Sequence, residues 1–384
     1  MNDPRRPPAD DDAAARRGDA PGESGLGTLL RRGVKSALAR WAVRHRPQEA
    51  SWPRPQDEAT HPWDGRRHYA EEYSFVAVQG DLAAIARIEW LPERACHRVW
   101  LFLLAEGEVH ALPGSGQLLV RGDEEESHWR SGGLEIDCAE PLQTWTVRFR
   151  GKVAARDGAG RPRVDVDADG TATARLCECR VDLTFTADAP PFVPGSDDDP
   201  ELLSQHLGEA SWDVDLLRGI RRRPLRAYVQ VGAFHGSVAL GPRILAVSAA
   251  GLREHAWGVR DWGASDRALR CFLAERGAPR AWVHRAVFPW LTLEGGFVRE
   301  ASGLVPVKEI GVTAERRPER APSHLGIDLE VDGAELAFEV ETVAEVGLEM
   351  DGRGRVELAF VRGADGGTVG VLALQERTVP RPAR

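Results

Sequence analysis

Runs in which apolar and polar residues alternate make up most of the chain from residue 68 onward. Trp145, Val147 and Phe149 occupy every second position of one such run, with polar residues between them. The runs 227–234 and 243–249 follow the same rule. A period of two is typical of β-strands with one buried face, so the pattern predicts a protein built mainly from strands.

Tight turns separate the alternating runs in the last part of the chain. Three Asp-Gly pairs occupy these positions: Asp332-Gly333, Asp351-Gly352 and Asp365-Gly366. An Asp-Gly pair between two alternating runs is the strongest short-range signal for a β-hairpin. Successive hairpins build an antiparallel meander, which closes into a barrel or packs as a sandwich. We therefore expect an all-β fold.

The N-terminal part has a different composition. Residues 1–25 hold almost no apolar side chains, which predicts a disordered tail. Residues 26–46 place apolar side chains at helical spacing and Arg and Lys on the other face, which predicts one short basic amphipathic helix. Such a helix either lies on an anionic membrane or docks its apolar stripe on the protein's own surface.

Two proline-rich stretches divide the rest of the chain. Residues 47–66 contain four prolines and predict a linker. Residues 190–200 predict a second one before the next group of alternating runs. We therefore expect a first β-domain over residues 67–215 and a second over residues 216–384.

The composition narrows the classes of function. The net charge is −9 at pH 7, and binding to phosphate backbones needs an excess of Lys and Arg, so we expect no nucleic-acid partner. No apolar run approaches the roughly 18 residues that span a bilayer, and the first residues lack the apolar core of a signal peptide. We expect a cytoplasmic protein, with attachment to the membrane surface through residues 26–46 as the alternative.

Residue types that bind ligands are unevenly used. The 12 Trp outnumber the 11 Phe and 3 Tyr, which favours a pocket for an apolar molecule, because large rings line cavities as well as cores. The five cysteines have no zinc-site spacing, and His206 and His284 stand alone in the sequence. We therefore expect reduced thiols, no metal and no cofactor.

The stretch GLREHAWGVRDWG, residues 251–263, concentrates charged and aromatic side chains. If the preceding strand continues through it, Arg253, His255 and Trp257 share one face, while Glu254 takes the other. Because buried charges have to be paired, the stretch predicts a buried polar and aromatic cluster.

A bend at Gly258 is expected to bring Arg260, Asp261 and Trp262 back to the same cluster. There we expect Asp261 to pair with an arginine and an arginine to lie over a Trp ring, a contact worth roughly 0.5–2 kcal/mol.

This motif resembles the Gly-x-Arg-Asp-His-Ser-Trp-Gly-x-Arg-Asp-Trp pattern of a bacterial family related to carotenoid 1,2-hydratase and AttH-like proteins. The matching residues are Gly251, Arg253, His255, Trp257, Gly258, Arg260, Asp261 and Trp262. Glu254 and Ala256 depart from the pattern, which has Asp and Ser there.

The resemblance extends over residues 65–384. Tyr228 and Gln230 match two positions of a His-Tyr-Glu-Gln segment upstream of the motif, and Glu72 stands where an N-terminal Glu is expected. The resemblance implies two consecutive lipocalin-like antiparallel β-barrels, the second of which would carry the motif.

Two of the roles open to the motif are structural closure and binding. Six side chains are candidates for either role: Arg253, Trp257, Arg260, Trp262, Tyr228 and Gln230. In the closure interpretation, stacked Arg and Trp side chains seal one end of a barrel. In the binding interpretation, which we favour for the protein as a whole, a barrel pocket holds a terpenoid, a steroid or an acyl chain, as barrels of about eight strands can.

The third role is catalytic. The resemblance implies a hydratase or cyclase that protonates an isoprenoid C=C bond, because a buried carboxylic acid can stay protonated near neutral pH. Asp261 or Glu254 would be the acid, His255 would manage the water, and Trp faces would shield the cation. Neighbouring arginines lower the pKa of a carboxylic acid and oppose this role, so whether the protein is an enzyme is left open.

Overall fold

The computed structural model describes residues 25–45, 52–117, 119–125, 127–166, 169, 171–214, 216, 225–275, 280–315, 317 and 320–380. The strands before residue 200 are β1 (Tyr69–Gln79), β2 (Leu82–Leu91), β3 (Cys96–Ala105), β4 (Glu108–Ala111), β5 (Leu119–Val120), β6 (Asp123–Glu125), β7 (His128–Ser131), β8 (Leu134–Glu140), β9 (Thr144–Arg156), β10 (Val164–Val166), β11 (Ala172–Ala174) and β12 (Leu176–Ala187).

The later strands are β13 (Arg226–Leu240), β14 (Arg243–Val259), β15 (Arg267–Glu275), β16 (Arg280–Val287), β17 (Thr292–Glu300), β18 (Gly303–Pro306), β19 (Glu309–Ala314), β20 (His324–Val331), β21 (Ala334–Met350), β22 (Gly354–Gly363) and β23 (Thr368–Arg377). The helices are α1 (Gly25–Arg44) and α2 (Pro200–Glu209), with short 3-10 turns η2 (Pro55–Glu58) and η3 (Pro92–Arg94).

Eight antiparallel strands close into the first barrel. Their order is β12-β13-β14-β1-β2-β3-β4-β9, and β9 pairs with β12 to complete the ring. The alternation predicted from the sequence places aromatic rings inside it, where Phe75, Phe185 and Phe234 meet with centroid distances of 5.2–6.2 Å. These rings are at most 2% exposed, so they form a close-packed core.

Two glycines make room for this aromatic core. Gly232 and Gly251 face each other across β13 and β14. A Cβ atom on Gly251 would lie 2.8 Å from Phe234, and one on Gly232 would lie 2.8 Å from Phe185. Glycine inside a strand often marks such a close approach.

The second sheet runs in the order β18-β17-β16-β15-β23-β22-β21-β20-β19. Among the described residues its edge strands β18 and β19 do not pair with each other, so this sheet forms an open half-barrel. The Asp-Gly pairs lie in its hairpin turns, as predicted, and Asp332 and Asp351 adopt positive φ angles of 41° and 55°. The prediction of an all-β fold with two consecutive antiparallel β-barrels is confirmed, the second barrel being the open half-barrel.

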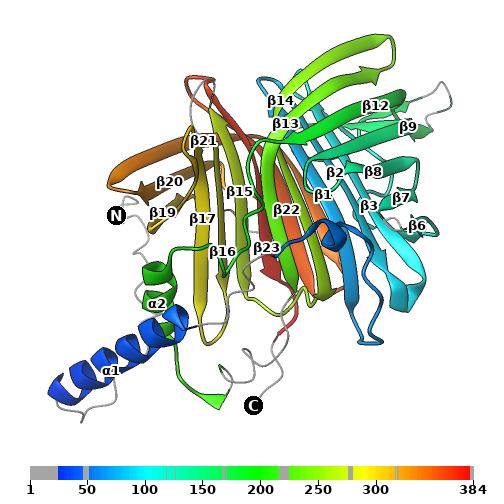
Figure 1. Ribbon diagram of the computed structural model, residues 1–384. Coiled ribbons are helices and arrows are strands. Elements are labelled where there is room, and N and C mark those ends of the chain that lie inside the picture. The colour runs from blue at the N-terminus through cyan, green and yellow to red at the C-terminus, as the bar shows by residue number, and fades with distance from the viewer. Residues whose placement is uncertain are drawn as a thin grey trace, which may run out of the picture.

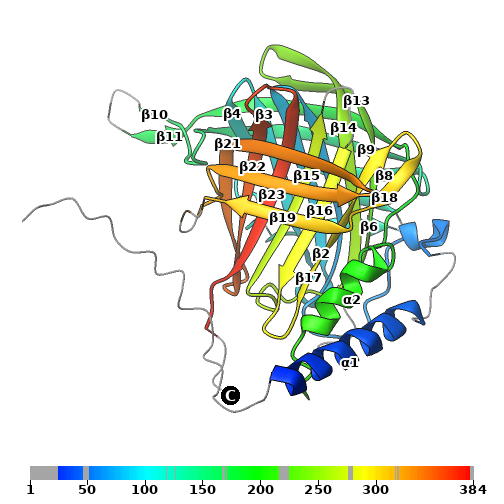
Figure 2. The same cartoon turned by 90° about the vertical axis from the view of Figure 1, so that its left-hand side faces the viewer.

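The two sheets lie against each other (Figures 1 and 2). Large side chains from both sheets fill the interface between them. Trp100 and Phe102 project from β3, and Phe272, Trp282 and Phe360 project from the second sheet. All five are at most 4% exposed, so the interface is built like the interior of a domain.

The sheets divide the chain at a different place from the predicted domain limits, 67–215 and 216–384. Both β13 and β14 belong to the first barrel, because β14 pairs with β1 along ten residues, and the change of sheet falls between β14 and β15. Alternation identifies a strand but not its neighbour, so the sequence pattern could not assign β14 to the earlier sheet. The motif therefore lies in the first barrel.

The predicted helix is present as α1, and it packs against α2 beside the second sheet (Figure 1). Over residues 34–44, where side-chain burial is described, Ala39 and Val43 are buried, whereas Val34, Leu38 and Trp41 of the predicted apolar stripe are 49–63% exposed. The predicted membrane contact stays a prediction. Neither described helix is long and apolar enough to cross a membrane.

The predicted disordered tail lies outside the described residues, apart from Gly25 at the start of α1.

We expect Phe185→Ala to lower the free energy of unfolding by about 3–5 kcal/mol, because it leaves a cavity among the rings of the first barrel. Leu176→Ala is the control on the same strand, since Leu176 is 48% exposed and its truncation should change stability by less than about 0.5 kcal/mol. Urea unfolding of the two variants measures the difference. Equal losses would contradict the assignment of Phe185 to the core.

Candidate functional site

The motif strand β14 separates two polar clusters, one on each face. Arg253 and His255 point into the first barrel, where they are at most 1% exposed. Glu254 points the other way, into a cavity between the first barrel and the second sheet. The structure thus shows the alternation expected from the sequence, and it makes the two faces of β14 chemically distinct.

Arg253 forms a buried ion pair inside the first barrel. Both of its terminal nitrogens donate to Glu58, at 2.8 Å each. The indole of Trp145 also donates to Glu58, at 2.7 Å, and the guanidinium lies 5.0 Å from the Trp145 ring centroid. Burial by itself would raise the pKa of the Glu58 carboxyl. The charge and hydrogen bonds of Arg253, together with His255 and Tyr228, outweigh burial and hold this pKa below its usual value.

Tyr228 and Gln230, the upstream candidates, belong to this inner cluster. The Tyr228 hydroxyl contacts Glu58 and lies 3.0 Å from Nδ1 of His255. The Gln230 side-chain oxygen accepts a hydrogen bond from Arg253, and its amide donates to the backbone oxygen of Leu142 at 3.0 Å. Both side chains therefore hold the charged residues in place.

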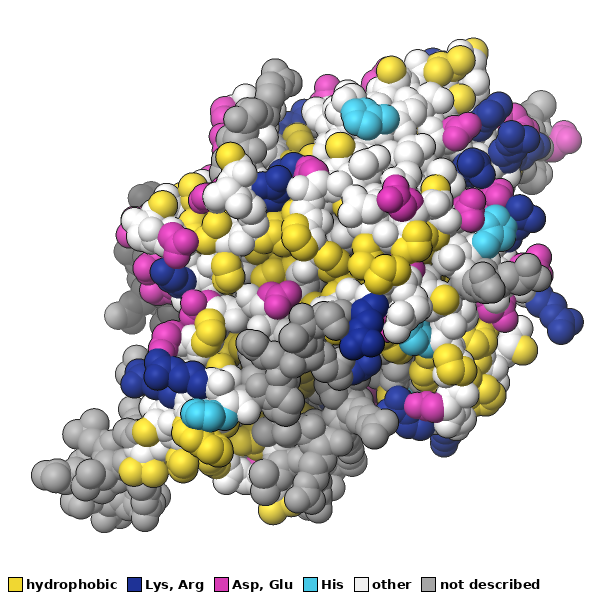
Figure 3. All heavy atoms as spheres, in the orientation of Figure 1, with side chains coloured by type: hydrophobic (Ala, Val, Ile, Leu, Met, Phe, Trp, Pro, Cys, Tyr) yellow, Lys and Arg dark blue, Asp and Glu magenta, His cyan; other side chains and the backbone are white. Residues whose placement is uncertain are grey.

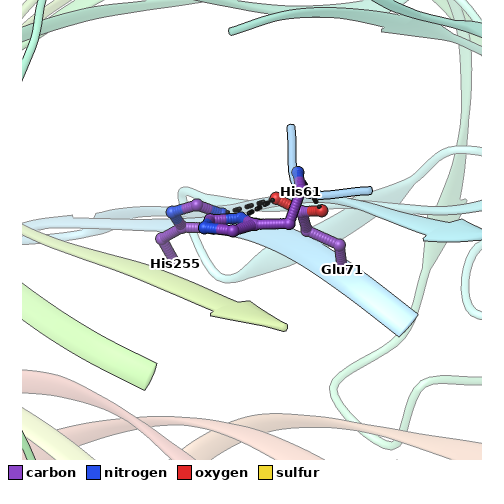
Figure 4. Close-up of side chains that lie close together, drawn as sticks. All are labelled: His61, Glu71 and His255. Carbon is purple, nitrogen blue, oxygen red and sulfur yellow. Dashed lines mark hydrogen bonds and ion pairs between the residues drawn. The ribbon is translucent and has the colours of Figure 1, made fainter. Parts of the chain in front are cut away.

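His255 is the centre of the inner cluster. Its Nε2 lies 3.0 Å from Oε1 of Glu71, and His61 approaches the same oxygen through Nδ1 at 2.9 Å (Figure 4). The His255 ring stacks on Tyr73 with a centroid distance of 4.1 Å, and the His61 ring stacks on Trp257 at 3.8 Å. Burial lowers the pKa of His255, which favours the neutral ring.

Arg260 points away from Arg253 and belongs to the outer cluster, whose other members are Glu72, Arg87 and Glu89. Arg260 binds Glu72 at 2.7 Å and Glu89 at 3.4 Å, and Arg87 binds the same two carboxylates. Burial raises the pKa of Glu72, and the facing Arg260 and Arg87 oppose that shift.

The cavity beside this outer cluster has a volume of about 100 Å³. Its apolar wall includes Trp100, Leu252, Trp262, Phe272, Trp282 and Leu358. Its polar wall includes Glu72, Arg87, Glu254 and Arg270. On the face of the molecule that Figure 3 shows, hydrophobic side chains gather near the middle, where the two sheets meet. A mainly apolar cavity with a few polar groups has the composition of a ligand site.

Asp261 lies outside both clusters. It is 3.4 Å from Arg353, which lies in the turn between β21 and β22 of the second sheet, and it accepts a hydrogen bond from the backbone N–H of Gly263 at 2.9 Å. The expected pairing with an arginine is present, but the partner comes from the second sheet. The expected stacking is present too, since Arg260 lies 5.2 Å from the ring centroid of Trp262. Of the two predicted acids, it is therefore Glu254, and not Asp261, that lies in the wall of the cavity.

Sequence reasoning missed Glu58, His61 and Glu71. The first two belong to the predicted linker. Its described part, residues 52–66, includes η2 and lies against the first barrel (Figures 1 and 2). No periodicity marks them, and only the tertiary structure shows that they enter the core. Glu71 carried a signal, because it shares a strand face with Tyr73 and Phe75 and so had to be a buried carboxylate.

Comparisons with known proteins agree with this architecture. Residues 54–379 match a family described as "Domain of unknown function (DUF7064)". The chain belongs to the DUF7064 family. No curated protein matches it.

Solved structures show to which proteins this DUF7064 member is similar in fold. A putative AttH from Nitrosomonas europaea has 10% identity and a TM-score of 0.50, covering 86% of this chain and 97% of its own. CghA has 13% identity, a TM-score of 0.46 and coverages of 83% and 90%. Kievitone hydratase from Nectria haematococca has 10% identity, a TM-score of 0.42 and coverages of 80% and 88%. The similarity to the putative AttH confirms the resemblance to AttH-like proteins for the fold.

We expect Glu58→Gln to lower the free energy of unfolding by about 3–5 kcal/mol, because Arg253 keeps its charge in the core without a counter-charge. Glu178→Gln is the matched control, since its side chain is 73% exposed and its contact with Lys152 is long, at 3.6 Å. The control should change stability by less than about 0.5 kcal/mol. If denaturant unfolding shows no difference between the variants, the ion pair does not support the barrel.

Proposed function

We propose that this protein binds a small apolar molecule in the cavity between its two sheets. The observation that carries the proposal is the cavity itself. Close-packed interiors contain few voids larger than a water molecule, and this one of about 100 Å³ lies in the middle of an otherwise dense interface. Three Trp rings in its wall offer broad apolar surfaces to a ligand.

The size of the cavity restricts the ligand. An engineered apolar cavity of about 150 Å³ takes up benzene, so a volume of about 100 Å³ admits a group of a few carbon atoms. One end of a terpenoid or an acyl chain meets this limit. A steroid nucleus would require the two sheets to move apart.

Polar groups in the wall would orient such a ligand. Glu254 and Arg270 form an ion pair at 3.3 Å, in which Arg270 is 42% exposed and Glu254 only 13%. The pair therefore connects the cavity with solvent, where it can bind a polar end group. The buried indole N–H of Trp100 has no acceptor among the described residues, so a ligand oxygen can serve as one.

A second candidate function is acid catalysis on a C=C bond at the same cavity. It is favoured by Glu254, a largely buried carboxyl group in the cavity wall, with Trp rings on the other walls that can stabilise a cation. Glu254 would give its proton to one alkene carbon, water would attack the other, and the water would return a proton to the carboxylate. Glu254 forms an ion pair with Arg270 at 3.3 Å, so its carboxyl group already has a partner and binding remains the first proposal.

Farnesol and laurate, titrated separately against the full chain, test the binding proposal through the fluorescence of the cavity Trp residues. We expect saturable quenching by at least one of them, and native mass spectrometry should show one bound molecule. Ala373→Phe, which fills the cavity from β23, should weaken binding by at least about tenfold, the equivalent of roughly 1.4 kcal/mol.

Ala246→Phe makes the same change on the exposed surface of β14 and should bind as the wild type does. Equal binding by Ala373→Phe and Ala246→Phe would rule out the cavity as the binding site.

The catalytic candidate predicts a product that is heavier than farnesol by one water, with deuterium on carbon when the reaction runs in D₂O. Glu254→Gln should then slow turnover by about 10²–10⁴-fold while binding stays within a few-fold, because only the proton transfer is lost. Asp261→Asn is the control and should keep its activity, since Asp261 lies outside the cavity wall. Binding without any hydrated product would eliminate the catalytic candidate and leave the binding proposal intact.

A further inference from the structure

His61, Glu71 and His255 lie together inside the first barrel, on the face of β1 and β14 that points away from the cavity (Figure 4). They come from three segments: the stretch before β1, β1 itself and β14. We propose that these three side chains bind one divalent transition-metal ion of the zinc type. The site is separate from the cavity between the sheets, and the proposal goes beyond the proposed function.

The donor atoms are already close to the arrangement that such an ion needs. His61 Nδ1, Glu71 Oε1 and His255 Nε2 all lie within 4.8 Å of one another, and the two nitrogens are 2.9 and 3.0 Å from the carboxylate oxygen. Tetrahedral zinc with bonds of about 2.0–2.1 Å separates its ligand atoms by roughly 3.3 Å. Small shifts that lengthen the two nitrogen–oxygen distances by a few tenths of an ångström therefore give the spacing that the ion requires.

The hydrogen bonds behind His255 indicate which ring nitrogen carries its proton. The Tyr228 hydroxyl has one proton and two neighbours, Glu58 and Nδ1 of His255. Glu58 is a carboxylate paired with Arg253 and only accepts, so the Tyr228 proton points to Glu58. Nδ1 of His255 must then be the donor to the Tyr228 oxygen.

With Nδ1 as the donor, Nε2 is the ring nitrogen that faces the Glu71 carboxylate, and in a neutral ring it carries a lone pair. Two acceptors 3.0 Å apart repel each other unless a cation lies between them. A metal ion bound to both removes the conflict, and a donated Nδ1–H is the usual support of a metal-bound histidine. A proton on Nε2 is the other cation that fits, and the experiment below distinguishes the two.

The remaining contacts hold the ligands in position. The backbone N–H of His61 donates to Oε2 of Glu71 at 2.8 Å, which leaves Oε1 for the ion. Trp257 stacks on the His61 ring at an interplanar angle of 13°, and Tyr73 stacks on the His255 ring at 20°. Such support sets the ring orientations before an ion arrives.

The cluster is accessible from one side. The His61 side chain is 21% exposed, whereas those of Glu71 and His255 are fully buried. An ion can therefore enter past His61. Three protein ligands leave the fourth tetrahedral position open on that side, in contrast to structural zinc sites, which use four side chains.

Zinc chloride titrated calorimetrically into the chelator-treated full chain tests the proposal. We expect one Zn²⁺ per chain, and Co²⁺ in its place should give the visible absorption of a tetrahedral site. Tyr228→Phe, which removes the hydroxyl that supports His255 and also contacts Glu58 but leaves all three ligands in place, should weaken Zn²⁺ binding by about 10–100-fold. His61→Ala, which removes a ligand, should weaken it further.

His128→Ala is the matched control, because His128 also pairs with a carboxylate, Asp137 at 3.0 Å, and is 29% exposed. It should bind Zn²⁺ as the wild type does. His61 is preferred to the fully buried His255 for the test, and circular dichroism of the metal-free variants verifies their fold. No uptake of Zn²⁺ by the wild type, or equal affinity in His61→Ala, would overturn the proposal and leave a proton between His255 and Glu71.

Discussion

The antiparallel pairing of β1 with β14 is the constraint on which both polar clusters depend. Its register sets Tyr73 opposite His255 and Glu72 opposite Ala256. Because side chains alternate across a sheet, the same pair of strands sends Glu71 and His255 into the barrel and sends Glu72 towards the second sheet. A slip of one residue would exchange the two faces and separate every buried charge from its partner.

The charged side chains of this strand pair can be buried because each one is paired with an opposite charge. Arg253 and Glu58 neutralise each other inside the barrel, and Arg260 with Arg87 neutralises Glu72 outside it. Loss of one partner from such a pair costs more than the pair contributes, because the remaining charge stays buried. The segment before β1 is therefore part of the barrel core, since it supplies Glu58.

The two faces offer different chemistry to a ligand. The outer face meets the second sheet at an apolar cavity lined by Trp rings, which suits a hydrocarbon group. The inner face gathers imidazoles around a carboxylate, which suits a cation. The motif supplies both, because Glu254 and Trp262 border the cavity while His255 belongs to the inner cluster. One short stretch thus joins two sites that share no side chain.

Local patterns in the sequence determined the class of secondary structure. Alternation predicted the strands, Asp-Gly pairs predicted hairpins, and helical spacing predicted α1. Alternation also predicted that Arg253 and His255 face away from Glu254. These features depend on which side chains are buried within a stretch of a few residues. The local order of apolar and polar residues therefore reveals them.

The tertiary structure alone decided which segments meet. It placed β14 beside β1, left the second sheet open among the described residues, and paired Asp261 with Arg353. It also inserted Glu58 into the first barrel from a segment without periodicity. The physical reason is that partners far apart in the chain are chosen by packing and by the cost of an unpaired buried charge, and neither leaves a local pattern in the sequence.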